Sequence, residues 1–201
     1  MSVKARNSVA REQRLSLAGG AVTSREHLLV ELVDETGTAI GACSVAEAHT
    51  APGRRHRAFS VLLYDRTGRV LLQRRATVKT RFASRWSNTC CGHPAPGQDT
   101  TTAAARRLSA ELGLTPDHTT PLAEVGVFQY HAADPGSGRV EREWDHILVA
   151  TLISGTPMPD EAEVSDFAWA APDPLRAEIT THPDVYTPWL PGVLSCASSV
   201  L

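Results

Sequence analysis

The pattern of apolar and polar residues divides the chain into a polar N-terminal stretch and a series of short apolar runs. Residues 1–25 are rich in Arg and Ser and show no periodic apolar face. We therefore expect a disordered tail, followed by a single domain over residues 26–201. Runs rich in Val, Leu, Phe and Tyr, bounded by turn residues, predict strands near residues 28–33, 58–64, 70–73, 125–130, 146–153 and 167–170.

One helix is predicted between these strands, over residues 100–112. Asp99 or Thr100 can cap its start, and Gly113 can end it. Its apolar face recurs at four-residue steps, at Ala104, Leu108 and Leu112. A second helix is expected after Pro172. Because strands precede, flank and follow the first helix, the order of elements predicts a mixed α/β or α+β sandwich rather than a doubly wound parallel sheet.

Composition narrows the class of protein. A chain of 201 residues with 42% hydrophobic content can bury a substantial core without disulfides. The net charge of −2 does not imply a nucleic-acid partner. The four cysteines form no CxxC pair, which favours a reducing cytoplasm, and no apolar run approaches the ~20 residues of a membrane span. The oligomeric state stays open, and a monomer is compatible with the sequence.

The stretch Asn88-Thr-Cys-Cys-Gly-His-Pro94 carries most of the candidate chemistry. It places the thiol of Cys91 two residues from the imidazole of His93. A free cysteine is commonly a small buried apolar residue, but its position beside a metal-binding side chain favours a chemical role for Cys91. A nearby cation would favour its thiolate, whereas a buried apolar neighbourhood would keep it a proton donor. Cys90 alternates to the other side of the extended chain and is expected to pack.

Three histidines and two glutamates form a candidate divalent-metal site. Its members are His49, His56, His93, Glu141 and Glu143. The turn-forming Pro52 and Gly53 lie between the first two histidines, so these can converge from a folded loop. The two glutamates are two residues apart, which in a strand places both on one face of the sheet. Such a set suits an octahedral Mn²⁺ or Mg²⁺ ion and is compatible with Zn²⁺.

The region from residue 92 to residue 114 matches the spacing of the Nudix box, in which several glutamates hold Mg²⁺ ions against a diphosphate. The glycines, the first arginine, the aliphatic positions and Glu111 are in register. The three other glutamate positions hold Gln98, Arg107 and Ala110. A box reduced to Glu111 cannot hold several ions in the same way, although one carboxylate can still help to anchor Mg²⁺ on a phosphate.

Arg107 and Glu111 are four residues apart and therefore share one face of the predicted helix. They form either a surface ion pair of little energetic value or a pair directed at a ligand. Their register with the box favours the second interpretation, in which Arg107 binds phosphate and Glu111 binds its metal.

Together these motifs resemble the type 1 isopentenyl-diphosphate delta-isomerases, which are enzymes with the Nudix fold. The resemblance covers about residues 27–190 and rests on collinear motifs at residues 48–50, 56–60, 71–76, 86–94, 106–113 and 141–143. It implies a mixed β-sheet sandwich flanked by helices. It also implies an isomerase of isoprenoid biosynthesis, which interconverts isopentenyl and dimethylallyl diphosphate by metal-dependent protonation and deprotonation.

The same resemblance implies roles for single residues. Cys91 and Glu143 would form the catalytic pair, and Tyr130 would assist the glutamate. The His/Glu cluster would hold Mn²⁺, Mg²⁺ or Zn²⁺, and Glu111 would help to hold a second Mg²⁺ on the substrate. Trp189 would close over the isoprenoid. The diphosphate would be bound by Arg75, Lys79 and Arg107.

One departure from the family pattern concerns Val45. Family members commonly carry a lysine there that reaches the diphosphate, so the affinity or the identity of the prenyl substrate stays open. Three alternatives remain: an isomerase-like enzyme acting on another prenyl diphosphate, a Nudix pyrophosphohydrolase, and a non-catalytic metal-binding protein. The reduced glutamate box argues against the second alternative, and the Cys91/Glu143 pair argues against the third.

Overall fold

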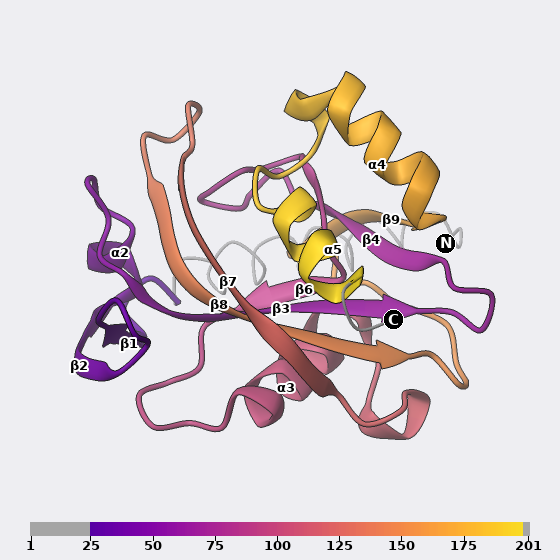
Figure 1. Ribbon diagram of the computed structural model, residues 1–201, viewed down its shortest axis with the longest axis horizontal. Coiled ribbons are helices and arrows are strands. Elements are labelled where there is room, and N and C mark those ends of the chain that lie inside the picture. The colour runs from indigo at the N-terminus through magenta and orange to yellow at the C-terminus, as the bar shows by residue number, and fades with distance from the viewer. Residues whose placement is uncertain (1–24, 199–201) are drawn as a thin grey trace, which may run out of the picture.

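The computed structural model describes residues 25–198 (Figure 1). The expected N-terminal tail therefore lies outside the described residues, apart from Arg25. The described strands are β1 (Leu29–Val33), β2 (Ala39–Ser44), β3 (His56–Tyr64), β4 (Val70–Arg75), β5 (Trp86–Ser87), β6 (Cys90–Gly92), β7 (Ala123–Ala133), β8 (Val140–Thr151) and β9 (Val164–Ala170). The helices are α2 (Val45–Ala48), α3 (Thr100–Leu112), α4 (Pro172–Thr181) and α5 (Leu190–Ser198), with 3-10 turns η1 (Pro116–His118) and η2 (Pro183–Val185).

Strand β3 is the centre of the mixed sheet. It runs parallel to β8 from the pair His56–Glu143 to the pair Tyr64–Thr151, and it pairs antiparallel with the short β6. The outer side of β8 is covered by β7, with which it forms a long antiparallel hairpin. On the far side, β4 pairs with β9 and β5. The sheet therefore combines parallel and antiparallel neighbours around one strand.

Helices cover both faces of this sheet, α3 on one face and α4 with α5 on the other (Figure 1). The alternation of side chains along β3 explains this arrangement, because successive residues of a strand point to opposite faces. Phe59, Val61 and Leu63 pack with the apolar face of α3. Leu62 packs with residues of α4 and α5. The predicted α+β sandwich flanked by helices is confirmed.

The predicted strands are present with shifted ends, the helix predicted over residues 100–112 is α3, and the helix expected after Pro172 is α4. Asp99 caps α3 by accepting a hydrogen bond from the Thr102 backbone N–H at 2.7 Å, and Gly113 ends the helix with φ of 67°. Strand β2, helix α2 and helix α5 were not predicted. The apolar residues of β2 are mostly exposed, so they show no clear alternation. Helix α5 begins Leu-Pro-Gly, a sequence with low intrinsic helix propensity.

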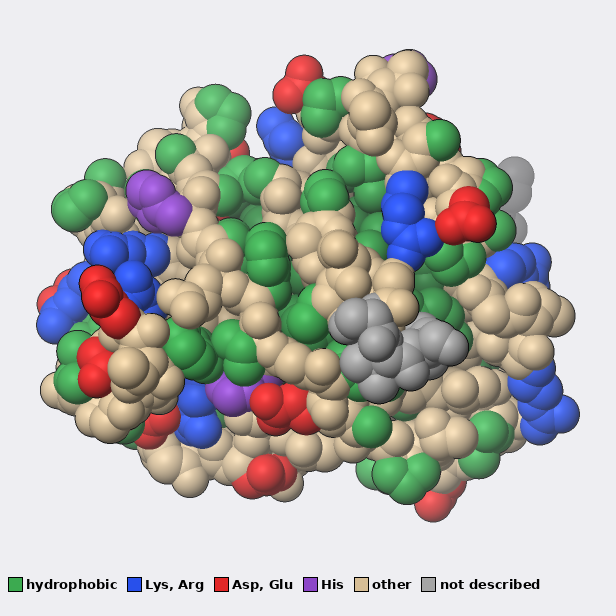
Figure 2. All heavy atoms as spheres, viewed as in Figure 1, with side chains coloured by type: hydrophobic (Ala, Val, Ile, Leu, Met, Phe, Trp, Pro, Cys, Tyr) green, Lys and Arg blue, Asp and Glu red, His purple; other side chains and the backbone are tan. Residues whose placement is uncertain are grey.

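Two further properties concern the length of the helices and the charges on the surface. Within residues 25–198, none of the helices combines the length and the apolar character that crossing a membrane requires. On the face shown in Figure 2, Lys and Arg side chains are dispersed among Asp and Glu side chains. This dispersion agrees with the small net charge of the chain.

The close approach of α5 to β7 gives a stability prediction. A Cβ added at Gly192 would collide with the ring of Phe128, which stacks on Tyr130. We expect Gly192→Ala to lower the free energy of unfolding by about 1–3 kcal/mol in urea denaturation, although alanine is the better helix former. Gly136→Ala is the control, since its Cβ would meet only Asp134 Oδ1 at 3.5 Å. A gain in stability for Gly192→Ala would contradict this account of the packing.

Candidate active site

The five residues of the candidate metal site come together from four segments of the chain. His49 follows α2, His56 begins β3, and His93 follows β6, whereas both glutamates lie on β8. Their ligand atoms all lie within 4.8 Å of one another, as expected from the sequence. The parallel register of β3 and β8 places His56 directly beside Glu143. The predicted placement of Glu141 on the same side of the strand as Glu143 is also present.

Backbone carbonyls orient two of the three imidazoles. His49 Nδ1 lies 2.7 Å from the Val45 carbonyl oxygen, and His56 Nδ1 lies 2.7 Å from that of Arg54. With each Nδ1 directed at a backbone carbonyl, Nε2 of each ring faces the cluster. A backbone acceptor on the far ring nitrogen is the usual arrangement around histidine ligands of metals.

The inner atoms of the cluster fit a divalent cation. His49 Nε2 and Glu141 Oε2 are buried 2.7 Å apart without a hydrogen bond between them, and His56 Nε2 also lacks a hydrogen-bond partner. Lone pairs that face each other at this distance repel unless a positive charge lies among them. Burial lowers the pKa of His93 to about 4, so this imidazole is neutral at physiological pH and able to bind a metal. Three nitrogens and two carboxylates are consistent with divalent-metal binding.

Glu143 is the most connected member of the cluster. Tyr130 Oη donates a hydrogen bond to its Oε2 at 2.6 Å, and His93 Nε2 lies 2.9 Å from its Oε1. Burial acts to raise the pKa of Glu143, but the contacts from His56 and His93 outweigh it and hold the pKa well below its usual range. Burial and the negative charge of Glu143 raise the pKa of Tyr130, so the phenol keeps its proton. Glu143 is therefore an ionised carboxylate.

Cys91 lies on β6, opposite Ser60 of β3, and its Sγ is 3.7 Å from Arg75 Nη1. Burial raises the pKa of this thiol to about 12, although the positive charge of Arg75 acts in the opposite direction. Of the two states left open by the sequence, the structure therefore favours the neutral thiol, a proton donor. Cys90 is fully buried in the core beneath α3, as expected.

An aromatic group forms one wall beside Glu143. Trp189, which is 2% exposed, stacks on Tyr130 with ring centroids 5.6 Å apart and meets Phe82 edge-on at 5.1 Å. Its Nε1 donates a hydrogen bond to Asn88 Oδ1 at 3.0 Å, and Asn88 Nδ2 donates to the Cys90 carbonyl oxygen at 2.8 Å. Asn88 thus ties the indole to the strand that carries the thiol.

A second group of contacts is charged. Lys79 Nζ and Arg107 Nη2 both contact Glu111 Oε1, at 3.2 and 2.6 Å. The same two cations contact Glu163 Oε2, Arg107 at 3.1 Å. Glu111 is 1% exposed, so its pairing with Arg107 is not a surface ion pair. Together these residues form a buried group of alternating charges, which we call the charged end.

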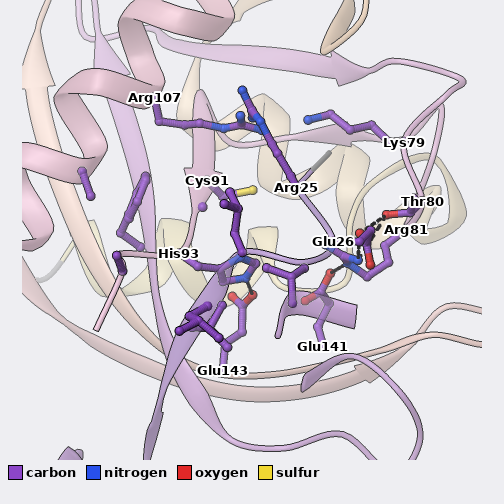
Figure 3. Close-up of a pocket in the computed structure, with 18 of the residues that line it drawn as sticks. Arg25, Glu26, Lys79, Thr80, Arg81, Cys91, His93, Arg107, Glu141 and Glu143 are labelled. Carbon is purple, nitrogen blue, oxygen red and sulfur yellow. Dashed lines mark hydrogen bonds and ion pairs between the residues drawn. The ribbon is translucent and has the colours of Figure 1, made fainter. Parts of the chain in front are cut away.

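One pocket of about 570 Å³ connects the two groups (Figure 3). Its walls include Cys91, Glu143 and Trp189 at one end, and Lys79 and Arg107 at the other. The predicted substrate-binding residues therefore share one cavity with the predicted catalytic residues. The three remaining members of the predicted site lie behind these walls: His49, His56 and Glu111. The roles of all the predicted site residues stay predictions.

Comparison with known proteins identifies the family. A model of the NUDIX domain matches residues 54–190. An isopentenyl-diphosphate Delta-isomerase from Nocardia farcinica is 59% identical over 170 residues, which cover 85% of this chain and 94% of that protein. An isopentenyl-diphosphate Delta-isomerase from Streptomyces griseus is 46% identical over 86% of this chain and 84% of that protein. The chain belongs to the isopentenyl-diphosphate Delta-isomerase family.

A solved structure supports the fold of this isomerase-family chain. DR0079 from Deinococcus radiodurans matches with a TM-score of 0.65 over 84% of this chain and 98% of that protein. The two sequences are only 19% identical, so this likeness concerns the Nudix fold alone.

Several residues around the pocket were not predicted from the sequence. Glu163 joins the charged end only because β9 pairs with β4, and its neighbours in sequence form no motif. Arg81 contacts Glu141 at 3.1 Å and Glu26 at 2.9 Å. Phe82 supports Trp189. Neither Arg81 nor Phe82 belongs to one of the motifs on which the family resemblance rests.

The metal fit gives a testable prediction for the isomerase-family cluster. His93→Ala should lower tightly bound divalent metal below one equivalent in elemental analysis of the purified protein, because losing one ligand of five costs affinity heavily. His146→Ala is the control, since that imidazole pairs with Glu124 outside the cluster. Unchanged metal content in His93→Ala would show that the cluster is misassigned.

The protonation state of Cys91 gives a second testable prediction. Only a thiolate reacts with iodoacetamide, and below the pKa the thiolate fraction rises tenfold per pH unit. With a pKa of about 12, alkylation of Cys91 should keep rising in this way between about pH 7 and about pH 9.5. Peptide mass spectrometry of the Cys90→Ala variant isolates the signal of Cys91. A plateau within this range would show that the thiol is already ionised near neutral pH.

Proposed function

We propose that this protein interconverts isopentenyl diphosphate and dimethylallyl diphosphate, the reaction for which its relatives are named. One observation carries the proposal. A neutral thiol and an ionised carboxylate, Cys91 and Glu143, line the same pocket, whose other end gathers the cations Lys79 and Arg107. A small prenyl diphosphate has the matching halves, an apolar alkene and a highly charged head.

The reaction moves one double bond by adding and removing a proton. The Cys91 thiol donates its proton to the terminal alkene carbon, which leaves a tertiary carbocation at the neighbouring branched carbon. The Glu143 carboxylate then removes a proton from the carbon on the diphosphate side, and the C–H electron pair forms the new double bond. The high pKa of the thiol favours its reprotonation before the next turnover. The reverse reaction uses the same groups in the opposite roles.

The aromatic wall protects and stabilises the cation. The indole of Trp189 can contribute roughly 1–2 kcal/mol of cation–π stabilisation in a desolvated site. Tyr130 stacks on this indole and donates its hydrogen bond to Glu143, so it holds the carboxylate toward the substrate. Phe82 and Asn88 keep the indole in place. Excluding water from this wall prevents capture of the cation by hydroxide or water.

The charged end binds the diphosphate. Lys79 and Arg107 of the charged end, together with Arg75 beside Cys91, donate charge-assisted hydrogen bonds to its oxygens. We assign Mn²⁺, Mg²⁺ or Zn²⁺ to the His/Glu cluster, where it would fix Glu143 and tune its basicity, and a second Mg²⁺ to Glu111, where it would neutralise diphosphate charge. Cys43, Cys90 and Cys91 are free thiols, which suits work in the reducing cytoplasm.

The test is conversion of isopentenyl diphosphate to the dimethylallyl isomer, followed by NMR in the presence of Mg²⁺. We expect Cys91→Ala and Glu143→Gln to lower kcat by at least about a hundredfold, since each removes a proton-transfer group. Cys90→Ala should keep most activity, because this thiol faces the core. Circular dichroism and metal analysis verify that the variants are folded and loaded.

Two results would overturn the proposal. Full activity of Cys91→Ala would remove the thiol from the mechanism. Release of inorganic phosphate from nucleotide diphosphates by the wild-type protein, without isomerisation of isopentenyl diphosphate, would instead favour a pyrophosphohydrolase.

A further inference from the structure

Arg25 reaches the charged end from the N-terminal edge of the described chain. Its Nη1 lies 2.9 Å from Glu163 Oε1, and its side chain, 40% exposed, lines the same pocket as Lys79 and Arg107. Figure 3 shows the side chains of these three residues pointing into one region of the pocket. The sequence predicted no function for this arginine.

The backbone around Arg25 is held against α2. The Leu28 N–H donates to the Arg25 carbonyl at 3.1 Å, which closes a turn. Ala46 N–H then donates to the Glu26 carbonyl at 2.9 Å, and Val45 N–H donates to the Leu28 carbonyl at 2.8 Å. These bonds place residues 25–28 beside the first turn of the helix that precedes His49.

Side chains hold the segment from the other side. The Glu26 carboxylate accepts hydrogen bonds from Arg81 Nη1 at 2.9 Å and from Thr80 Oγ1 at 3.1 Å. Arg81 in turn contacts Glu141 of the candidate metal site. Arg25 therefore projects from a segment that is bonded both to α2 and to the loop beside Lys79.

The charges around Arg25 leave room for an anion. Glu163 is shared by Arg25, Lys79 and Arg107, so one carboxylate serves three cations. Among residues 25–198, Glu111 is the other carboxylate in contact with this group, so these cations outnumber their carboxylates. A diphosphate entering the pocket would offer these cations stronger acceptors than the single carboxylate of Glu163.

Helix α2, beside the segment that carries Arg25, contains no Lys or Arg. Val45, the first residue of α2, lines the same pocket with an apolar side chain. A positive charge on this wall therefore comes from the neighbouring segment, through Arg25, and not from the helix.

We propose that Arg25 is a diphosphate-binding residue, delivered to the pocket by the segment before β1, and that Glu163 holds its guanidinium there until the substrate enters. The substrate class rests on the proposed function, but the anion contact does not. Because a guanidinium forms two parallel hydrogen bonds to phosphate oxygens, Arg25 sets substrate affinity and leaves the proton-transfer groups untouched.

The test is Arg25→Gln, with Mg²⁺-pyrophosphate as the binding probe in titration calorimetry and isopentenyl diphosphate in kinetics. We expect the Kd for pyrophosphate and the KM each to rise about tenfold, and kcat to stay within about twofold, since a charge-assisted contact is lost. The dependence of binding on salt should also weaken, because one fewer cation takes part. Arg66→Gln, in the β3–β4 turn, removes the same charge from another place and should change neither constant.

Two further variants separate anion binding from support of the fold. Arg25→Lys should retain part of the affinity, and Val45→Lys combined with Arg25→Gln should recover it, because either ammonium returns a cation to this wall. If Arg25→Gln binds pyrophosphate as the wild type does, the proposal is wrong. It is equally wrong if Arg25→Lys and the double variant bind as weakly as Arg25→Gln, since Arg25 would then only support the segment.

The two proposals fail separately. Arg25-dependent binding of pyrophosphate without isomerisation of isopentenyl diphosphate would leave the anion site and overturn the isomerase function. Isomerisation of isopentenyl diphosphate with a KM that is the same for wild type and Arg25→Gln would leave the isomerase function and overturn the role of Arg25.

Discussion

The parallel pairing of β3 with β8 is the constraint on which the site depends. Its register sets His56 beside Glu143, while β7 sets Tyr130 opposite the same glutamate and β6 sets Cys91 opposite Ser60. A slip of one residue would turn both glutamates of β8 to the other face of the sheet. The apolar residues of β3, buried against helices on both faces, hold this register and with it the geometry of the metal cluster and the thiol.

Cys91 and Glu143 line one pocket and are held there in opposite protonation states. Burial raises the pKa of the Cys91 thiol, whereas the imidazoles hold Glu143 as a carboxylate despite its burial. Tyr130 stays protonated, and its hydroxyl donates a hydrogen bond to Glu143. A pair of groups whose surroundings push their pKa values apart is the arrangement that proton transfer in both directions requires.

The charged end meets a different requirement. Buried cations are costly unless they are paired, and here Lys79 and Arg107 are paired with Glu111 and Glu163. These pairs hold the cations in place at the pocket wall, where the proposed diphosphate would replace a carboxylate with a phosphate oxygen. The segment around Arg25 and Glu26 joins this network to the metal cluster through Arg81, so both ends of the pocket share one set of supports.

Local features of the sequence were enough to predict the α+β class, the helix over residues 100–112 and the parity of Glu141 and Glu143, because periodicity and capping act over a few residues. The motif around Cys91 and His93 likewise marked the candidate chemistry without a structure. The membership of Arg25, Arg81 and Glu163 in the site was decided only by tertiary structure, since strand pairing and the docking of residues 25–28 bring distant segments together. The same holds for the protonation of Cys91, because burial is a property of the folded surroundings and not of the neighbouring residues in the chain.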